Sequence, residues 1–155
     1  MSKKCPLSVH DVHVWLEKVA FLDALINSKI AERDQVMTMA TKITPALTGM
    51  PHQDGVSDKV GNAAQRLADM AVELNDLIDE YIDQKRAVVA VLEKLPPRLY
   101  MAMHKRYVLY ETWEDIAEEM HISTVTLWRW HLKSLEILQN VIECNVKSEY
   151  NSIIE

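Results

Sequence analysis

The chain has 155 residues, of which 48% are apolar and 26% charged, and its formal net charge at pH 7 is -6. This length suits one ordinary domain or two small ones, and the apolar content is enough for a core, which excludes a largely disordered chain. The negative charge excludes a general attraction of the whole surface to nucleic acid. Any affinity for DNA must therefore come from a local basic patch, and it should be modest.

Cysteine usage and the lengths of the apolar runs bear on location. Cys5 and Cys144 lie far apart and form no CxxC pair, which is typical of a reducing compartment rather than of a disulfide scaffold. We see no leader peptide at the N-terminus, and no apolar run is long enough to cross a bilayer. We therefore expect a cytoplasmic protein with no membrane partner.

Helix breakers are scarce and clustered. The chain has only three glycines and five prolines, and four of these eight fall between Pro45 and Gly55, which predicts an all-α fold. The first helix is expected from Ser8 to Lys42, with Ser8 as N-cap and Asp11 completing a capping box. Its apolar residues recur at steps of three or four residues, or multiples of these: Val12, Leu16, Val19, Leu22, Ile26, Ile30 and Met37.

A loop from Ile43 to Val56, followed by an N-cap at Ser57 or Asp58, leads into a second helix that is predicted from Asp58 to Leu95. Its core positions alternate in steps of four and three residues, as in a coiled-coil heptad. These positions are Val60, Ala64, Leu67, Ala71, Leu74, Ile78, Tyr81, Lys85, Val88, Leu92 and Leu95. Two helices of similar length joined by one loop predict a long antiparallel two-helix hairpin. Its apolar surface exceeds what one partner helix covers, so we expect further packing, either against the C-terminal module or against a second chain. In the second case the hairpin helps to form a homodimer, which is the oligomer that we predict.

The segment Leu95-Pro96-Pro97 ends this helix, because proline cannot continue a helix but can begin one. Three shorter helices are predicted next: Arg98–Leu109, Trp113–Met120 and Thr124–Asn145. A flexible tail is expected over residues 146–155. The expected organisation is thus a hairpin over residues 8–95 and a three-helix unit over residues 96–145.

The segment from Thr112 to Leu127 has the pattern of a helix, a short turn and a second helix. Thr112 is suited to cap the first helix, with Asp115 closing a capping box, and Ser123 is suited to cap the second. Ile116 and the small Ala117 are predicted to face inward, where the two helices cross. The inner face of the last helix is expected to consist of Leu127, Trp130, Ser134, Leu135 and Leu138.

The opposite face of that helix, near its N-terminus, carries residues suited to duplex DNA. A recognition helix presents its N-terminal residues to base edges in the major groove. Arginine is suited to guanine there, and threonine or valine to the methyl group of thymine. We expect four residues to read bases, namely Thr124, Val125, Trp128 and Arg129. Three others are expected to contact phosphates, namely Lys133, Arg106 and Lys105.

Three motifs carry a resemblance to known proteins: LPPR at 95–98, HKRY at 104–107, and TWEDIAEEMHISTVTLWRWHLKSLEIL at 112–138. Together they resemble region 4 of bacterial sigma factors. Over most of the chain, the sequence is similar to the ArpU/RinA-like late-gene activators of phages and prophages. The resemblance implies promoter binding through a helix-turn-helix, with the base-reading positions on the same four residues. His121 stands where the family usually has glycine, which predicts an unusual backbone angle there.

Other functions remain open. The sigma-like fold can serve as a protein-interaction module that binds RNA polymerase or another protein, which the acidic net charge favours. A packaging-terminase small subunit also joins a helix-turn-helix to oligomerisation helices, although the module here is C-terminal. An enzyme is the least favoured class, because no nucleophile, metal set or phosphate loop occurs. We expect no cofactor and no metal, since His10 and His13 lack a third ligand.

The sequence also leaves two interpretations open for the role of several side chains. Trp128 packs on a neighbouring domain, or it reaches DNA or polymerase. Arg129 is a solvated surface charge, or it reads a base. The carboxylates of the Trp113–Met120 helix form a solvated face or a patch that faces polymerase: Glu114, Asp115, Glu118 and Glu119.

Overall fold

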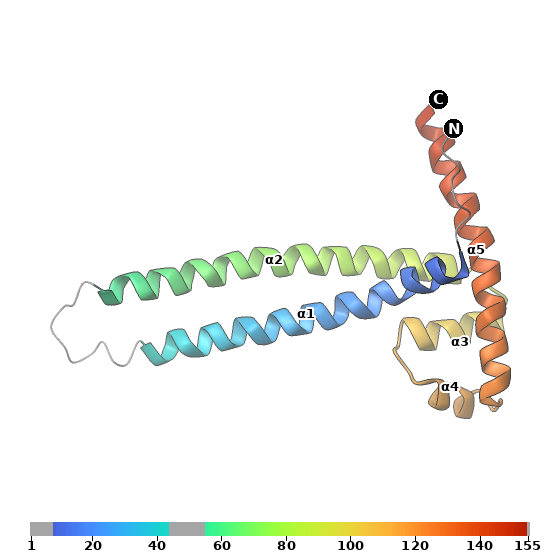
Figure 1. Cartoon of the computed structure of the whole chain (residues 1–155), viewed down its shortest axis with the longest axis horizontal. Helices are drawn as coiled ribbons and strands as arrows, with labels where there is room; N and C mark the ends of the chain where they lie inside the picture. The colour runs from blue at the N-terminus through green and yellow to red at the C-terminus, as the bar shows by residue number, and fades with distance from the viewer. Residues whose placement is uncertain (1–7, 44–54, 155) are drawn as a thin grey trace. The chain divides into compact units, whose positions relative to one another are not determined.

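The computed structural model describes residues 8–43 and 55–154, and the side chains of residues 8–42 and 59–142. Within these residues it contains five helices and no strand (Figure 1). They are α1 (Val9–Ile43), α2 (Gly55–Leu92), α3 (Pro97–Tyr107), α4 (Trp113–Glu119) and α5 (Thr124–Ile154). The all-α prediction is confirmed. Most of the predicted loop from Ile43 to Val56 lies outside the described residues.

The chain divides into two compact units. One is Leu22–Ile82, and the other combines Met1–Phe21 with Asp83–Glu155. We call them the α1–α2 unit and the C-terminal unit. Both long helices contribute to both units, so each unit is described by itself below.

In the α1–α2 unit, the two helices face each other through a buried seam bordered by ion pairs. Leu22, Met70 and Leu74 are buried. The ammonium group of Lys29 lies 3.5 Å from a carboxylate oxygen of Glu73, which links the two helices. A second link joins the Arg66 guanidinium to Glu32, also at 3.5 Å.

The predicted seam of α2 is confirmed over its second half and partly wrong over its first. Seven predicted positions are buried or half-buried, as expected: Leu67, Leu74, Tyr81, Lys85, Val88, Leu92 and Leu95. Val60 is exposed, and at three further positions the preceding residue points inward instead: Ala63, Met70 and Leu77 are buried or half-buried, whereas Ala64, Ala71 and Ile78 are exposed. At each of these steps both neighbours are apolar, so spacing alone did not decide between them. For the same reason the predicted Met37 of α1 is exposed, whereas Val36 is half-buried.

In the C-terminal unit, α1 begins with the predicted capping box. Asp11 N–H donates to Ser8 Oγ at 3.1 Å, and Ser8 N–H donates to Asp11 Oδ2 at 2.8 Å. This stretch of α1 buries Val12, Leu16 and Val19. The core also takes in Val88, Leu92, Leu95, Leu99, Met103, Tyr107, Ile116, Leu127, Leu135 and Leu138.

Several predicted helix ends differ from the structure. Helix α2 begins at Gly55, so Ser57 and Asp58 lie inside it and are not its N-cap. It ends at Leu92 rather than Leu95. Pro96 disfavours the helical conformation of Leu95, the residue before it, so the helix ends ahead of that position. Backbone hydrogen bonds of the tighter i to i+3 type close this end, from Leu95 N–H to Leu92 O at 2.9 Å.

Helix α5 continues to Ile154, nine residues beyond the expected end at Asn145. Residues 146–154 are polar on the whole, but they contain no proline or glycine that would end a helix. Among the helices of the described residues, none combines the length and the apolar character that crossing a bilayer requires.

Candidate nucleic-acid interface

Helix α4 begins at a hydroxyl cap. Asp115 N–H donates to Thr112 Oγ1 at 3.2 Å, and the Thr112 hydroxyl donates to Asp115 Oδ2 at 2.7 Å. The predicted pairing of these two residues is therefore confirmed. It satisfies an amide of the first helical turn that has no partner within the helix.

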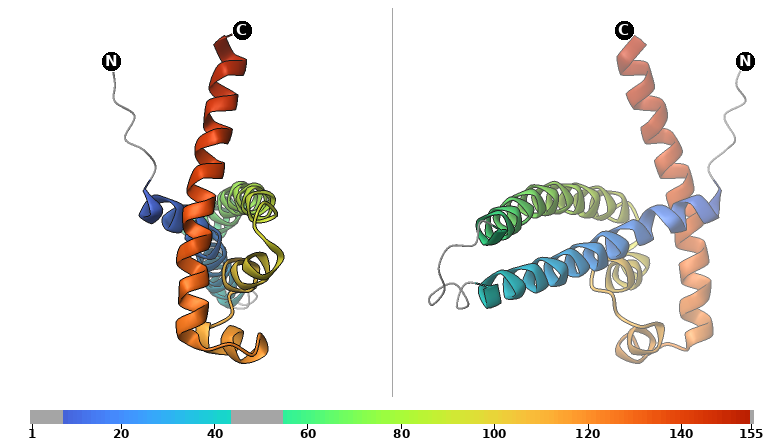
Figure 2. Two further views of the ribbon diagram at one scale, coloured as in Figure 1. Left: turned by 90° about the vertical axis from the view of Figure 1, so that its right-hand side faces the viewer. Right: turned by 60° about the vertical axis from the view of Figure 1, so that its left-hand side comes forward.

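The turn after α4 is a Schellman motif (Figure 2 shows the tight passage from α4 into α5). Ile122 N–H donates to Ala117 O at 3.0 Å, and His121 N–H donates to Glu118 O at 3.2 Å. His121 occupies the position where this motif favours glycine, with φ at 56°. The predicted unusual backbone angle at His121 is confirmed.

Helix α5 starts at Thr124, directly after its cap. Thr126 N–H donates to Ser123 Oγ at 3.1 Å, and the Ser123 hydroxyl donates to Thr126 Oγ1 at 2.9 Å. The cap fixes where the helix begins and therefore which side chains stand on its first two turns. Ser123 is the N-cap, as predicted.

The inner face of α5 packs on α3 and α4. A buried cluster of four residues joins α3, α4 and α5: Ala102, Ile116, Ala117 and Leu127. Trp130 packs against this cluster and is half-buried. Ser134 is fully buried and donates its hydroxyl proton to Trp130 O at 2.7 Å. With Leu135 and Leu138 also buried, the predicted inner face is confirmed.

The outer face of α5 exposes the predicted base-reading side chains. Val125 is 60% exposed and Trp128 is 52% exposed. Thr124, Arg129 and Lys133 are exposed as well. The structure thus brings five of the seven predicted contact residues onto the first three turns of one helix.

The sixth residue, Lys105, is engaged within the molecule. Its ammonium group lies 2.7 Å from Glu119 and 3.5 Å from Glu111, and the side chain is only 11% exposed. The hydrogen bond to Glu119 raises the pKa of Lys105, helped by the charges of both carboxylates. A phosphate would have to compete with these two carboxylates for the same cation.

The seventh residue, Arg106, contacts the ring of Trp113, which in turn contacts the exposed Trp128. Its guanidinium donates to the backbone oxygen of Glu111 at 3.0 Å and stands 5.0 Å above the ring of Trp113. The rings of Trp113 and Trp128 meet edge to face at 6.0 Å. Trp128 is therefore a half-exposed ring that is held in place by Trp113.

A buried histidine supports the aromatic rings of the outer face. His131 is 3% exposed and lies beneath this aromatic group. Its Nε2 lies 2.7 Å from the hydroxyl of Tyr107, while the buried Nδ1 has no hydrogen-bond partner among the residues that the structure describes. Burial lowers the pKa of His131 to about 4, and the charges of His13 and Arg106 add to this effect. His131 is thus a neutral structural group that supports Trp113 and Trp128, with ring centroids 4.7 and 5.2 Å away.

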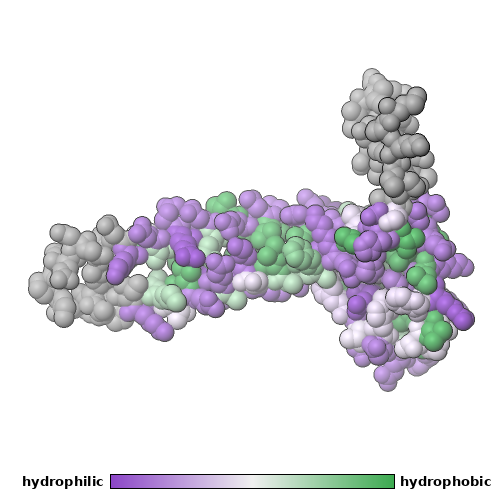
Figure 3. Space-filling model, viewed as in Figure 1, coloured by the Kyte–Doolittle hydropathy of each residue, from purple (hydrophilic) through white to green (hydrophobic). Residues whose placement is uncertain are grey.

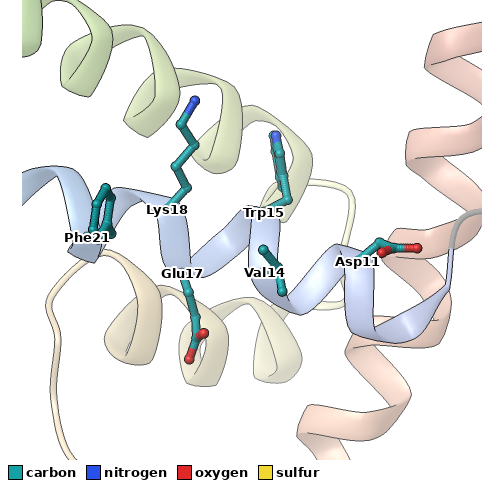
Figure 4. A pocket seen from close by; sticks show the side chains of 6 residues that line it. All are labelled: Asp11, Val14, Trp15, Glu17, Lys18 and Phe21. Carbon is teal, nitrogen blue, oxygen red and sulfur yellow. The ribbon is translucent and has the colours of Figure 1, made fainter.

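An open hollow of about 500 Å³ lies along α1 (Figure 4). Six side chains of this helix line it: Asp11, Val14, Trp15, Glu17, Lys18 and Phe21. Asp11 is already bonded to Ser8, and Glu17 lies 3.4 Å from His13. The hollow therefore offers no convergent set of polar groups. In the part of the chain that the structure describes, no three His, Cys, Asp or Glu side chains are grouped so as to hold a metal ion.

Comparison with known proteins adds no assignment to this geometry. No family model, no curated protein and no solved structure matches the chain.

Proposed function

We propose that this chain is a DNA-binding transcription regulator, of the phage or prophage late-gene activator type, which binds promoter DNA through α4 and α5. In this proposal residues 96–145 form a sigma-region-4-like helix-turn-helix. Residues 8–95 form an antiparallel hairpin that makes the protein a homodimer. The observation that carries the proposal is the outer face of α5, where Thr124, Val125, Trp128, Arg129 and Lys133 are exposed beside a capped helix start.

The shape of this face suits the major groove, which admits one α-helix. The first turn presents Thr124 and Val125, which are small enough to let the helix end approach the base edges. Arg129 follows a little over one turn later, at a distance from which its guanidinium reaches guanine. Lys133 stands one turn beyond Arg129 on the same side, in a position suited to a phosphate.

The charge distribution predicts that the affinity for duplex DNA depends only weakly on salt concentration, compared with other DNA-binding proteins. Arg129 and Lys133 are exposed, whereas Lys105 is held by two carboxylates. With about two to three phosphate contacts per protomer, the logarithm of affinity should fall with the logarithm of salt at a slope of about -2 to -3. Raising salt from about 50 to 200 mM should then weaken each protomer's binding about 15- to 65-fold.

The test is fluorescence anisotropy with labelled duplexes that tile the promoter regions near the gene. Arg129→Ala should cost roughly 1–3 kcal/mol on the preferred duplex and relax the choice of base at one position. Lys133→Ala should weaken all duplexes alike and reduce the salt slope by about one. Lys94→Ala is the matched control, because it removes an exposed cation that follows α2 and is not part of α5. Equal effects of all three substitutions would refute base reading by α5.

A second candidate function is binding of RNA polymerase through the same unit. It is favoured by the acidic surface of α4, where Glu114, Asp115 and Glu118 are exposed. The discriminating result is a folded protein that binds no duplex at low salt but binds purified RNA polymerase. Charge reversal at Glu114 and Glu118 should then abolish that complex, while Arg129→Ala leaves it unchanged.

A further inference from the structure

Helix α2 has three distinct faces within the α1–α2 unit. One face packs on α1 and contains Met70, Leu74 and Leu77. A second face is polar and exposed, with Arg66, Asp69, Glu73 and Asp76. The third face is apolar and exposed, and Figure 3 shows hydrophobic residues reaching the surface of α1 and α2 among hydrophilic ones.

We name this third face the α2 stripe. Its members are Ala64, Ala68, Ala71, Asn75, Ile78 and Ile82. All six are exposed, Ile78 to 38% and Ile82 to 44%, and Val72 beside them is 61% exposed. The steps between members alternate between four and three residues, which is the spacing of a coiled-coil seam. The α2 stripe is thus a second heptad seam, distinct from the one that packs on α1.

We propose that the α2 stripe binds the α2 stripe of a second copy of this chain, in antiparallel orientation about a two-fold axis beside residue 73. This inference refines the homodimer part of the proposed function and does not depend on DNA binding. Its basis is that the stripe is complementary to itself in size, polarity and charge.

Size complementarity selects the orientation. With the two-fold axis midway between Ala71 and Asn75, Ala64 lies opposite Ile82 of the second copy, and Ala68 lies opposite Ile78 of the second copy. Every layer then combines a small side chain with a larger one, so one interhelical distance suits the whole seam. In a parallel pair, alanine would meet alanine at one end and isoleucine would meet isoleucine at the other. The distance between the axes of packed helices is roughly 8 to 10 Å and increases with the size of the side chains between them. The helices of a parallel pair would therefore diverge toward the isoleucine end.

Polarity fits the same arrangement. Asn75 of each copy lies next to the two-fold axis, and the two residues are about 6 Å apart along the helix direction. Because helical side chains lean toward the N-terminus, the two amides lean toward each other in an antiparallel pair. The two amides can therefore hydrogen-bond to each other across the axis, which removes the cost of enclosing an asparagine.

Charge also permits two acidic chains to meet here. The α2 stripe carries no charged residue, and the carboxylates of Asp69, Asp76 and Asp83 lie about 100° around the helix from it. In the antiparallel pair these carboxylates point outward to solvent. Asp79 borders the stripe and lies opposite Gln65 of the second copy. Gln65 donates one N–H to Asp69 at 2.9 Å and has a second N–H to offer.

The area available predicts a weak dimer. A stripe from Ala64 to Ile82 is about 27 Å long, and covering some 140° of each helix buries about 400 Å² per copy. The total of about 800 Å² falls in the class of weak and transient interfaces. We therefore expect self-association in the micromolar range or weaker.

The first test is sedimentation velocity of the full chain from about 1 to 200 μM, a range set by weak association. The wild-type protein should pass from monomer to dimer, and Ile78→Glu should weaken the association at least tenfold. Ile78 is partly exposed on a helix surface, and a circular dichroism spectrum checks that the variant is folded. Met37→Glu, at a 50% exposed position of α1 in the same unit, is the matched control and should associate like wild type.

The second test determines orientation by cysteine cross-linking, with Cys5 and Cys144 replaced by serine. A mixture of Ala64→Cys and Ile82→Cys chains should form a disulfide-linked dimer on mild oxidation, whereas neither variant should cross-link alone. Cross-linking of each variant with itself would overturn the proposal in favour of a parallel pair. A monomer at every concentration would overturn it as well, and would assign the stripe to a different partner.

The experiments distinguish a failure of the α2 pairing from a failure of the proposed DNA-binding function. Arg129→Ala should leave sedimentation unchanged. An Ile78→Glu protein that still binds DNA, together with wild-type protein that is monomeric, overturns only the α2 pairing. A dimeric wild-type protein that binds no duplex overturns only the DNA-binding function.

Discussion

Removing the Tyr107 hydroxyl should show how much its hydrogen bond to the buried imidazole of His131 contributes to stability. Tyr107 Oη and His131 Nε2 are 2.7 Å apart, and Nδ1 of the same ring already has no partner. Tyr107→Phe keeps the ring and its packing but leaves both ring nitrogens unsatisfied. An unsatisfied buried polar group costs about 1–3 kcal/mol. We expect the free energy of unfolding of the C-terminal unit to fall by about 2 kcal/mol, in the middle of that range.

The assay is urea unfolding followed by tryptophan fluorescence. The chain's four tryptophans all lie in the C-terminal unit, so the signal reports on that unit: Trp15, Trp113, Trp128 and Trp130. With an m-value of about 2 kcal/mol/M, the midpoint should fall by about 1 M. The matched control is Tyr100→Phe, on the same helix and half-buried, which should change stability by less than about 0.5 kcal/mol.

A double variant completes the design. Tyr107→Phe combined with His131→Leu removes both polar partners, and replacing both partners by apolar groups is close to neutral. The double variant should therefore be more stable than Tyr107→Phe alone. The reasoning is refuted if Tyr107→Phe and Tyr100→Phe lose the same amount, or if the double variant is the least stable of the three.

Three further predictions follow from other features. As pH falls through 6.5 toward 4, the C-terminal unit should lose up to about 3 kcal/mol, because the unfolded state protonates His131 first and the folded pKa is only about 4. Urea midpoints measured at each pH should show this loss, and His131→Leu should abolish it. His121→Gly should raise stability by about 0.5–1 kcal/mol, since φ is 56° there, and thermal melting that shows a loss would contradict this. Under the proposed function, Glu119→Gln should strengthen duplex binding several-fold and steepen the salt slope by about one, because it frees Lys105 from its nearest carboxylate. Anisotropy with an unchanged slope would show that Lys105 lies out of reach of DNA.

The helix-turn-helix was predictable because local chemistry defines each of its parts. Hydroxyl residues at Thr112 and Ser123 mark the two helix starts, and hydrogen bonds within three residues of each confirm them. The strained angle at His121 followed from its place in the turn. The inward residues of α4 and α5 followed from helical periodicity, since a polar residue separates most of the apolar ones.

The parts that were missed depend on contacts between distant residues. The seam of α2 was shifted by one residue at three positions, because pairs such as Met70 and Ala71 are both apolar and only the packing of α1 distinguishes them. The ion pair between Lys105 and Glu119 joins residues 14 positions apart on different helices, and no local pattern predicts it. The burial of His131 depends on rings contributed by α1, α3 and α4.

Under the proposed function, the engagement of Lys105 would also affect how fast the protein finds its target on DNA. Non-specific binding to DNA comes from free cations near phosphates, and the two carboxylates beside Lys105 remove one of the few cations close to α5. A DNA-binding protein with such weak non-specific affinity dissociates quickly from random sequence and slides only briefly along it. If the proposed function holds, the search would consist mainly of repeated encounters through solution, and the time on the correct site would be determined by the proposed base contacts of α5 rather than by charge.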